Sequence, residues 1–412
     1  MCVTDNTCMN FTKKFLITGF CLTLAAVLAL GASFLQPGCK NCDCDKSRAV
    51  SAPLKGSEPV ITAKAAFLIE ANSGKVLFTK DENKRLPIAS MVKITTLAVI
   101  YDALEAGQIK MGDMVMVSRE ASGMGGSQAF LDFDSEYSVS DLIKSIVIAS
   151  ANDSCVALAE LIAGSEADFV VKMNELAEKL GMTNTNYVNC TGLPAAESYS
   201  CAADVAKVYR YIMKSPFYGE FNKVWMYDLT HPSGRVTGLT NTNRHARFYS
   251  GCEGGKTGFT SEAGHCITVT ATRGSLKPVA VIIGADNSQT RFAESGNLMS
   301  YVFDCYENKL VVSAAKPLGT VKVRGAECES MEVFAKQNFY DLSKKGEKGK
   351  PEVNVDFAGS VRAPFTANDA LGKVVVTDDG KVVAEIDVVA AADVPAITYW
   401  GAVKKVVGGF KL

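Results

Sequence analysis

The chain has few histidines, almost no net charge and only one long apolar run. Three histidines among 412 residues limit histidine-based catalysis and His-rich metal sites. The 43 Lys and Arg residues nearly balance the 44 Asp and Glu residues, giving a formal net charge of -1. Without a basic excess the chain does not neutralise a phosphate backbone, so we exclude a general nucleic-acid binder. Hydrophobic residues make up 48% of the chain and charged residues 21%, which excludes a largely disordered protein.

The single long apolar run lies near the N-terminus, which excludes a transporter with several membrane spans. It extends from Phe15 to Leu35 and follows Lys13 and Lys14. A positive flank before an apolar segment is typical of a cleaved export signal or a retained anchor, rather than of a core helix. The residues LQPGC at 35–39 are similar to a bacterial lipobox but depart from it at two positions. We assign residues 1–36 to a signal or anchor. The rest of the chain is expected outside the cytoplasm, at the outer face of the membrane or secreted.

Cysteine is plentiful, with 13 residues, but its spacing is irregular. Cys39, Cys42 and Cys44 lie in a polar linker at 37–60. Three thiols without a fourth ligand favour free thiols over a soft-metal site. The remaining cysteines do not resemble a disulfide framework. Cys252 and Cys266 either meet across neighbouring strands or act as small buried hydrophobes.

The part after the linker alternates between strand and helix patterns. AAFLIE and KVLF, joined by Asn-Ser-Gly, predict a β-hairpin, and later strands are expected at KTGFT, HCITVTATR and PVAVIIGAD. Helices are expected over residues 90–106, 140–148, 154–163, 165–180 and 291–303. This order predicts an α/β (α+β) domain with a mainly antiparallel sheet flanked by helices.

The chain changes character near residue 312. Short Val-rich runs separated by Gly, Pro and Asp predict a small all-β domain over 311–395, with a hairpin turn at 378–380. It carries no visible ligand chemistry, so we expect a spacer or a partner-docking module. Over 396–412, apolar residues at near-helical spacing accompany three lysines. This pattern suits an amphipathic helix on an anionic membrane surface, and a packed or frayed terminus is the alternative.

The first candidate chemical motif is Ser90-Met91-Val92-Lys93 at a predicted helix start. The i, i+3 spacing places the Ser90 hydroxyl and the Lys93 amine on one helical face. A serine is a poor nucleophile until a base takes its proton, and a lysine is such a base only when its pKa is lowered. The Ser90 N–H is a candidate oxyanion donor. An isolated match is more often a helix cap beside a solvated lysine.

The second motif is Ser150-Ala151-Asn152, in a break between two predicted helices. The Ser150 hydroxyl suits proton transfer from Lys93 to a leaving amine. The Asn152 amide suits holding a substrate carbonyl and orienting the lysine. Alone, the segment is equally a turn with capping side chains.

The third motif is Lys256-Thr257-Gly258 on a predicted strand. Lys256 is placed to supply the field that keeps Lys93 neutral and to attract an anion. Thr257 can donate a hydrogen bond to a carboxylate, and Gly258 lets a substrate backbone approach the strand closely. Alone, the segment is an exposed turn.

The three motifs agree in order and context, and together they resemble the penicillin-recognising serine enzymes. Longer segments carry the resemblance further: LPIASMVKITT, GGSQAFL, IASANDSCVALAE, CTGLP, NTN at 241–243 and GGKTGFTSEAGHC. These resemble the D-alanyl-D-alanine carboxypeptidases, the low-molecular-mass penicillin-binding proteins of peptidase family S11. The resemblance covers roughly residues 60–305, which implies a catalytic domain at 61–310, and extends more weakly through the β domain and the tail.

The resemblance implies a serine enzyme that removes the terminal D-alanine from peptidoglycan stem peptides through an acyl-enzyme. The implied catalytic residues are Ser90, Lys93 and Ser150, and the implied substrate-binding residues are Asn152, Lys256, Thr257, Gly258 and Arg291. Within this set, Arg291 would assist with the substrate carboxylate. The expected partners are the peptidoglycan pentapeptide, β-lactams as inhibitors and the cytoplasmic membrane surface, with no nucleic acid. No cofactor and no metal are implied.

Three alternative functions fit the sequence less well. A class A β-lactamase needs a Glu on a loop after the second motif, and Glu197 has the wrong neighbours for that role. A triad hydrolase lacks its G-x-S-x-G motif. A β-lactam sensor with a silenced site is disfavoured by the intact motifs. Cys190 and Phe259 depart from residues common in the family, and His265 is interpreted as packing rather than catalysis.

Overall fold

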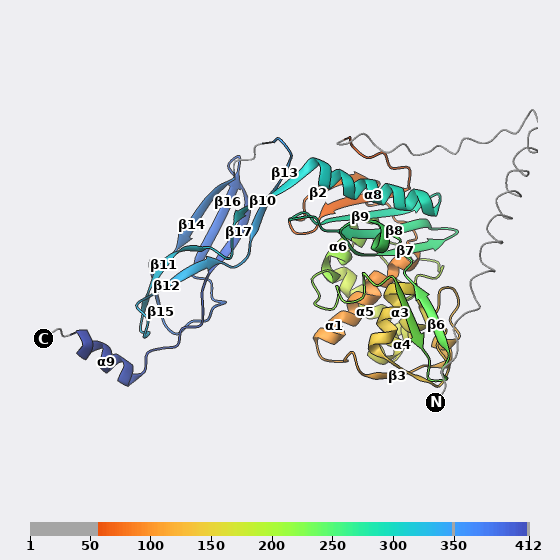
Figure 1. Cartoon of the computed structure of the whole chain (residues 1–412), viewed down its shortest axis with the longest axis horizontal. Helices are drawn as coiled ribbons and strands as arrows, with labels where there is room; N and C mark the ends of the chain where they lie inside the picture. Colours follow the sequence, from red (N-terminus) through yellow and green to blue (C-terminus); the bar gives the residue numbers. More distant parts are fainter. Residues whose placement is uncertain (1–56, 348–350, 410–412) are drawn as a thin grey trace, which may run out of the picture. The chain divides into compact units, whose positions relative to one another are not determined.

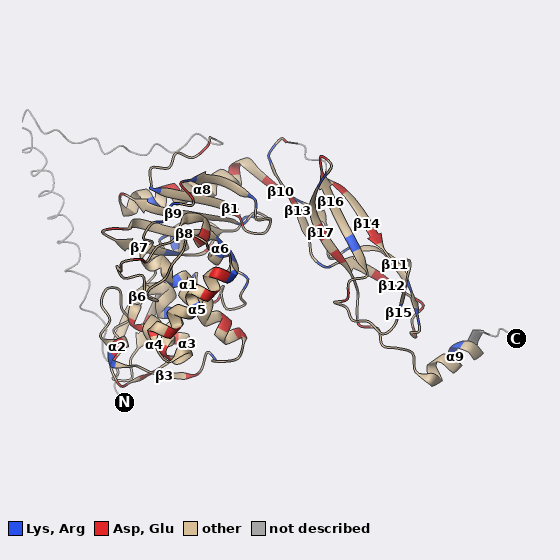
Figure 2. Cartoon of the chain, turned by 180° about the vertical axis from the view of Figure 1, so that it is seen from behind, with Lys and Arg blue, Asp and Glu red and all other residues tan. Residues whose placement is uncertain are grey.

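A computed structural model describes residues 57–347 and 351–409. The predicted signal or anchor at 1–36, the lipobox-like sequence and the linker cysteines lie outside the described residues. Among the helices within the described residues, none is both long and apolar enough to cross a membrane. Figure 2 shows Lys and Arg interspersed with Asp and Glu along the chain, in keeping with its balanced charge.

A five-stranded sheet forms the centre of the larger domain. Its strand order is β2 (Val76–Lys80), β1 (Ala65–Glu70), β9 (Pro278–Ala285), β8 (Gly264–Ala271) and β7 (Cys252–Thr260). Every neighbouring pair is antiparallel. The predicted hairpin of β1 and β2 and the mainly antiparallel sheet are thereby confirmed. β7 is an edge strand, and it carries the third motif.

Both faces of this sheet are buried. Along β1, Phe67 and Ile69 belong to one apolar core, whereas Ala66 and Leu68 belong to a second core. Alternate side chains of a strand point to opposite faces, so the two cores lie on opposite sides of the sheet. This explains why β1 and β9 read as continuous apolar runs rather than as alternating ones.

Helices cover the two faces, as Figure 1 shows. α8 (Ser288–Cys305) packs on the face of the second core. The other face carries a larger helical layer, whose members are η1 (Ala89–Val92), α1 (Lys93–Glu105), α3 (Val139–Ala149), α4 (Asn152–Ala163), α5 (Glu166–Lys179) and α6 (Ala202–Ile212). Shorter elements complete the domain: β3 (Met114–Met116), α2 (Arg119–Ser122), β4 (Glu136–Ser138), β5 (Met226–Thr230), β6 (Val236–Thr240) and α7 (His245–Phe248).

The C-terminal part is rich in β-structure, as predicted. A six-stranded sheet has the order β14 (Glu352–Phe357), β16 (Gly372–Asp378), β17 (Lys381–Ala390), β12 (Ser330–Ala335), β11 (Pro317–Arg324) and β15 (Ser360–Arg362). β10 (Tyr306–Val312) pairs with β13 (Phe339–Lys344). The predicted turn joins β16 to β17, and α9 (Tyr399–Gly409) follows the sheet.

Cys252 and Cys266 do not meet across neighbouring strands, which corrects one of the two expectations. In the β7–β8 pair, Cys252 lies opposite Ala271, and Cys266 lies opposite Gly258. Both cysteines are free and buried. They therefore act as small hydrophobic side chains of the sheet.

Candidate active site

Ser90 lies in the short 3-10 turn that leads into α1. The helix itself begins at Lys93, three residues later than the sequence predicted. Ala89, directly before the serine, has a positive φ of 47°, a conformation that costs free energy and persists only where the surroundings impose it. Gly192 and Gly258 approach so closely that a Cβ on either would lie 3.0 Å from the Ser90 nitrogen. Two glycines from distant segments thus hold the turn of the serine.

Lys93 is fully buried beneath Ser90. Its Nζ lies 3.2 Å from the Ser90 Oγ and 2.6 Å from the Asn152 Oδ1 that accepts its hydrogen bond. A third bond runs to the backbone carbonyl of Thr191. Burial lowers the pKa of Lys93, while the neighbouring Cys155 partly opposes this shift. A lysine with a lowered pKa and a serine hydroxyl within reach has the arrangement that general-base activation needs.

Lys256 approaches the same point from the edge strand. Its Nζ donates a hydrogen bond to the Ser150 Oγ, at 2.8 Å, and another to the Thr257 carbonyl, at 3.1 Å. Burial lowers its pKa well below the ordinary lysine value, and the charge of Lys93 lowers it further. Burial is the largest cause of the lowered pKa of both lysines, and Lys256 is not among the groups that shift the pKa of Lys93.

Ser150 ends α3 in the left-handed conformation, with φ of 65° and ψ of 33°. This break turns its hydroxyl toward the β7 lysine, and the chain starts α4 at Asn152 two residues later. The predicted break between two helices is thus a bend that brings Ser150 to Lys256. The sequence did not predict the left-handed conformation of Ser150, because mainly Gly and Asn indicate that conformation.

Asn152 uses both ends of its amide within the protein. Its Oδ1 accepts from Lys93, and its Nδ2 donates to the Gly125 carbonyl at 2.6 Å. Its backbone N–H donates to the Ser127 carbonyl at 2.8 Å. Asn152 therefore orients Lys93, and it also binds the loop at 125–127 through both its side chain and its backbone N–H.

Asp153 anchors the next stretch of that loop and was missed by the sequence reasoning. Its buried carboxylate accepts the N–H of Ala129, at 3.0 Å, and of Leu131, at 3.1 Å. An acidic residue in the first turn of a helix was the available signal, although it usually indicates no more than favourable helix-end electrostatics. Thr191 was missed for another reason, because its contribution is a backbone carbonyl.

Thr257 and Gly258 follow Lys256 on β7 and contact neighbouring segments of the chain. The Thr257 hydroxyl donates to the Thr242 hydroxyl at 2.9 Å. A Cβ on Gly258 would lie 2.8 Å from the Ile88 carbonyl oxygen, so only glycine lets β7 approach the Ser90 turn this closely. Gly258 thus allows β7 to pack against the Ser90 turn. The sequence interpretation had assigned it only to the approach of a substrate backbone.

Arg291 reaches the site from behind β7. Its guanidinium donates to the Gly258 carbonyl at 3.1 Å and to the Cys266 carbonyl at 3.3 Å. The side chain is buried, and burial lowers its pKa to about 10. These contacts fix the position of β7 beside Ser90.

The arrangement brings all three motifs to one place. Ser90 with Lys93, Ser150 with Asn152, and Lys256 with Thr257 come from η1 and α1, the α3–α4 break and β7. They form two sets of hydrogen bonds, one among Ser90, Lys93 and Asn152 and the other among Ser150, Lys256 and Thr257. Within the described part of the chain, no group of three or more His, Cys, Asp or Glu residues is placed to hold a metal ion. His265 stacks on Phe259, with ring centroids 4.3 Å apart.

Comparisons with known proteins agree with this geometry. Residues 52–287 match the family model described as D-alanyl-D-alanine carboxypeptidase, and residues 306–396 match that of the penicillin-binding protein 5 C-terminal domain. The D-alanyl-D-alanine carboxypeptidase DacF of Bacillus subtilis is 37% identical over 353 residues, covering 85% of this chain and 91% of the relative.

Solved structures give the same result. Penicillin binding protein 5 from Haemophilus influenzae superposes with a TM-score of 0.67 at 28% identity, covering 82% of this chain and 99% of that one. A peptidoglycan synthesis regulatory factor (PBP3) from Streptococcus pneumoniae superposes with a TM-score of 0.68 at 25% identity, covering 81% and 100%.

Proposed function

The chain belongs to the D-alanyl-D-alanine carboxypeptidases of peptidase family S11, and on this premise we propose that Ser90 is the nucleophile of its serine-type reaction. The enzyme is a penicillin-binding protein of the low-molecular-mass class. The observation that carries the proposal is the buried Lys93 Nζ, 3.2 Å from the Ser90 Oγ. A serine so placed can lose its proton to an amine whose pKa burial has lowered.

Acylation follows from these positions. The Ser90 Oγ attacks the carbonyl carbon between the two terminal D-alanines while its proton passes to the Lys93 Nζ. The carbonyl oxygen takes the negative charge, facing the Ser90 backbone N–H. The C–N bond then breaks, and the departing amine takes the proton held by Lys93 through the Ser150 hydroxyl, which leaves Lys93 neutral again. Free D-alanine leaves, and an ester joins Ser90 to the shortened stem peptide.

Deacylation reverses the same roles. A water molecule gives its proton to Lys93 and attacks the ester carbonyl, and the Ser90 oxygen regains a proton as the ester breaks. A β-lactam amide takes the place of the peptide bond in the first half of this reaction, which accounts for penicillin binding at Ser90.

The substrate carboxylate is proposed to lie at Lys256 and Thr257. The Lys256 side chain contacts Ser150, and the neighbouring Thr257 hydroxyl contacts Thr242. An arriving carboxylate favours the charged form of Lys256, and this charge in turn favours the neutral form of Lys93. Arg291 adds positive charge from behind β7 and holds the Gly258 carbonyl. Substrate binding thus supports the base form of Lys93.

We further propose that the enzyme works outside the cytoplasm at the membrane surface. The apolar segment at 15–35 after two lysines supports export or anchoring. In α9, Tyr399 and Trp400 are 76% and 71% exposed, and Val406 and Val407 are 64% and 65% exposed. Aromatic and aliphatic side chains on an exposed terminal helix with lysines fit the interface of an anionic membrane.

The test is release of D-alanine from a tripeptide ending in D-Ala-D-Ala, using the purified full-length chain. We expect steady release by the wild type and none by Ser90→Ala, because the variant lacks the hydroxyl that lies 3.2 Å from the Lys93 Nζ. Ser250→Ala, which removes an exposed hydroxyl, should retain the full rate. An unchanged rate in Ser90→Ala would remove that residue from the mechanism, and penicillin labelling without D-alanine release would identify a sensor instead of an enzyme.

A further inference from the structure

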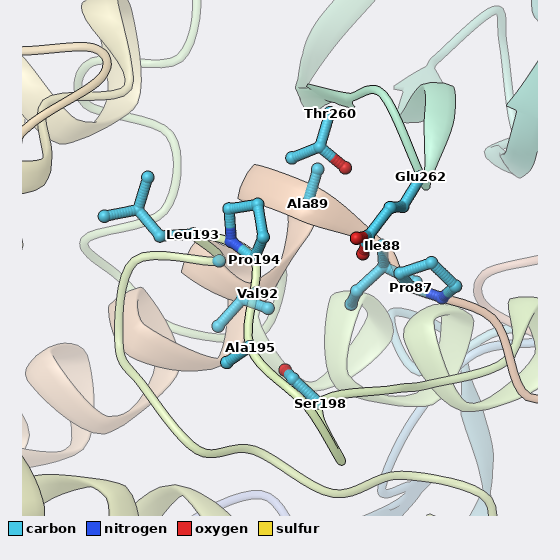
Figure 3. Close-up of a pocket in the computed structure, with 11 residues that line it drawn as sticks. Pro87, Ile88, Ala89, Val92, Leu193, Pro194, Ala195, Ser198, Thr260 and Glu262 are labelled. Atoms are coloured by element: carbon cyan, nitrogen blue, oxygen red, sulfur yellow. The ribbon is translucent and has the colours of Figure 1, made fainter.

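A hollow lies beside the turn before Ser90 and the end of β7 (Figure 3). The space between its atoms is about 290 Å³ when the open solvent at its mouth is counted. Its walls come from the turn before Ser90, the loop after Gly192 and the end of β7. The lining residues that matter below are Ile88, Ala89, Leu193, Pro194, Thr260 and Glu262.

This hollow lies on the far side of Ser90 from Lys256. Ile88 and Ala89 line it and directly precede the serine. Side chains alternate along a strand, so Thr260 faces the same side of β7 as Lys256 and Gly258. Gly258 contacts the Ile88 backbone, and Thr260 lies two residues beyond it. The order along β7 is therefore anion site, serine, hollow.

The order gives the direction of a bound peptide. With the leaving carboxylate at Lys256 and Thr257, the acyl part of the substrate must extend from Ser90 toward Thr260. β7 is an edge strand, and an extended peptide can add to such an edge through backbone hydrogen bonds. A strand advances about 3.3 Å per residue, so the residue before the D-Ala-D-Ala pair lies one step, about 3.3 Å, beyond the D-alanine whose carbonyl Ser90 attacks. Its side chain is then at the hollow.

The chemistry of the walls is asymmetric. Leu193 and Pro194 give an apolar wall, and Glu262 is the only ionisable residue of the 11 that line the hollow. In Figure 3 the Glu262 carboxylate points back toward Ile88, across the hollow. Among the described residues it forms no ion pair within 4.0 Å, and the Lys64 Nζ binds the Glu262 backbone carbonyl at 3.3 Å. An aliphatic chain ending in a cation would meet both walls.

We propose that this hollow, the Glu262 pocket, binds the side chain of the residue before the D-Ala-D-Ala pair, and that Glu262 selects a side chain ending in an ammonium group. The substrate class is a stem peptide with lysine or another diamino acid at that position. The proposal rests on the proposed function of Ser90. An amine already joined to another peptide has lost its charge, so Glu262 favours stem peptides whose amine is still free.

The test compares two tripeptides, Nα-acetyl-L-Lys-D-Ala-D-Ala and its Nα,Nε-diacetyl counterpart, through kcat/KM for D-alanine release. We expect the wild type to prefer the free amine by roughly 2- to 5-fold, the discrimination that a solvent-exposed ion pair supplies. The preference should vanish in Glu262→Gln, reverse in Glu262→Lys and weaken with added salt. The matched control Glu175→Gln removes an exposed carboxylate on α5 and should leave both rates unchanged.

The outcomes separate the two proposals. No release from either peptide by the wild type would overturn the proposed function. Equal rates on the two peptides would overturn the Glu262 pocket alone, as would a preference that survives Glu262→Gln. A preference lost equally in Glu175→Gln would assign the effect to overall charge and would also overturn the Glu262 pocket.

Discussion

At the scale of single residues, the site depends on two buried lysines with different tasks. Lys93 contacts the Ser90 and Asn152 side chains, while Lys256 contacts Ser150. Burial lowers both pKa values, and an ammonium without water around it survives only with partners. The hydrogen-bond acceptors around each lysine therefore decide which one carries a proton when a substrate arrives.

Replacing Lys93 by arginine tests the base directly. A guanidinium stays protonated throughout the working pH range, so Lys93→Arg should lower the rate of Ser90 acylation by a β-lactam by roughly 10²- to 10⁴-fold at every pH. In the wild type, the rate should rise with pH and level off with an apparent pKa below the ordinary lysine value of 10.5, because burial lowers the Lys93 pKa. Stopped-flow acylation by a chromogenic β-lactam measures both effects.

The exposed Lys84 provides the comparison for this experiment. Lys84→Arg should keep the wild-type rate and pH profile. An acylation rate in Lys93→Arg that matches the wild type would assign the proton transfer to another group.

At the scale of elements, the site is built where β7 meets the turn before α1. The Cβ that Gly258→Ala adds would lie 2.8 Å from the Ile88 carbonyl oxygen and 3.0 Å from the Ser90 nitrogen, so β7 or the turn must shift. A displacement on the order of 1 Å can cost about 10²-fold in rate. We expect Gly258→Ala to lose D-alanine release by about this factor, measured as kcat/KM.

Gly238→Ala on β6 is the matched control. A Cβ there would lie 3.5 Å from the Asp228 Oδ1, an ordinary contact. It should retain the wild-type rate. Thermal unfolding of both variants distinguishes a local shift from a loss of the fold, and full activity in Gly258→Ala would show that the close approach is dispensable.

The sequence predicted the helices and strands better than the contacts between elements that lie far apart in the chain. The Asn-Ser-Gly turn and the apolar runs were sufficient for β1, β2, β8 and β9, and the turn at 378–380 for β16 and β17. α6 was missed, although its sequence AADVAKVYRYI has an amphipathic pattern. The Thr191 carbonyl bond to Lys93 joins residues 98 positions apart and depends on the backbone path, which no local pattern encodes.

At the scale of the whole molecule, a buried histidine links stability to pH. His245 in α7 has its Nε2 2.9 Å from the Ser295 Oγ and packs edge-on against Tyr249 and Phe292. Burial lowers its pKa from 6.5 to about 4, so the native protein keeps it neutral while the unfolded chain binds a proton. Its contribution to stability is present above pH 6.5 and is lost as the pH falls toward 4.

When the pH falls from 7 to 5, protonation of His245 in the unfolded chain should lower the unfolding free energy of the wild type by about 2 kcal/mol. His245→Gln cannot take up the proton and should lose correspondingly less over the same interval. Urea unfolding at the two pH values measures the difference. Between pH 8 and pH 7 the two proteins should change in parallel, and an identical loss down to pH 5 would assign the acid sensitivity to other groups.

The contacts that hold Lys93, Ser150, Asn152 and Lys256 are made by the chain's own atoms. The hydrogen-bond donors and dipoles of the site are therefore already oriented when a peptide binds. Binding free energy is not needed to arrange them. Holding Ala89 and Ser150 at positive φ costs free energy when the chain folds, and each molecule folds once. Each later turnover then proceeds without repeating it.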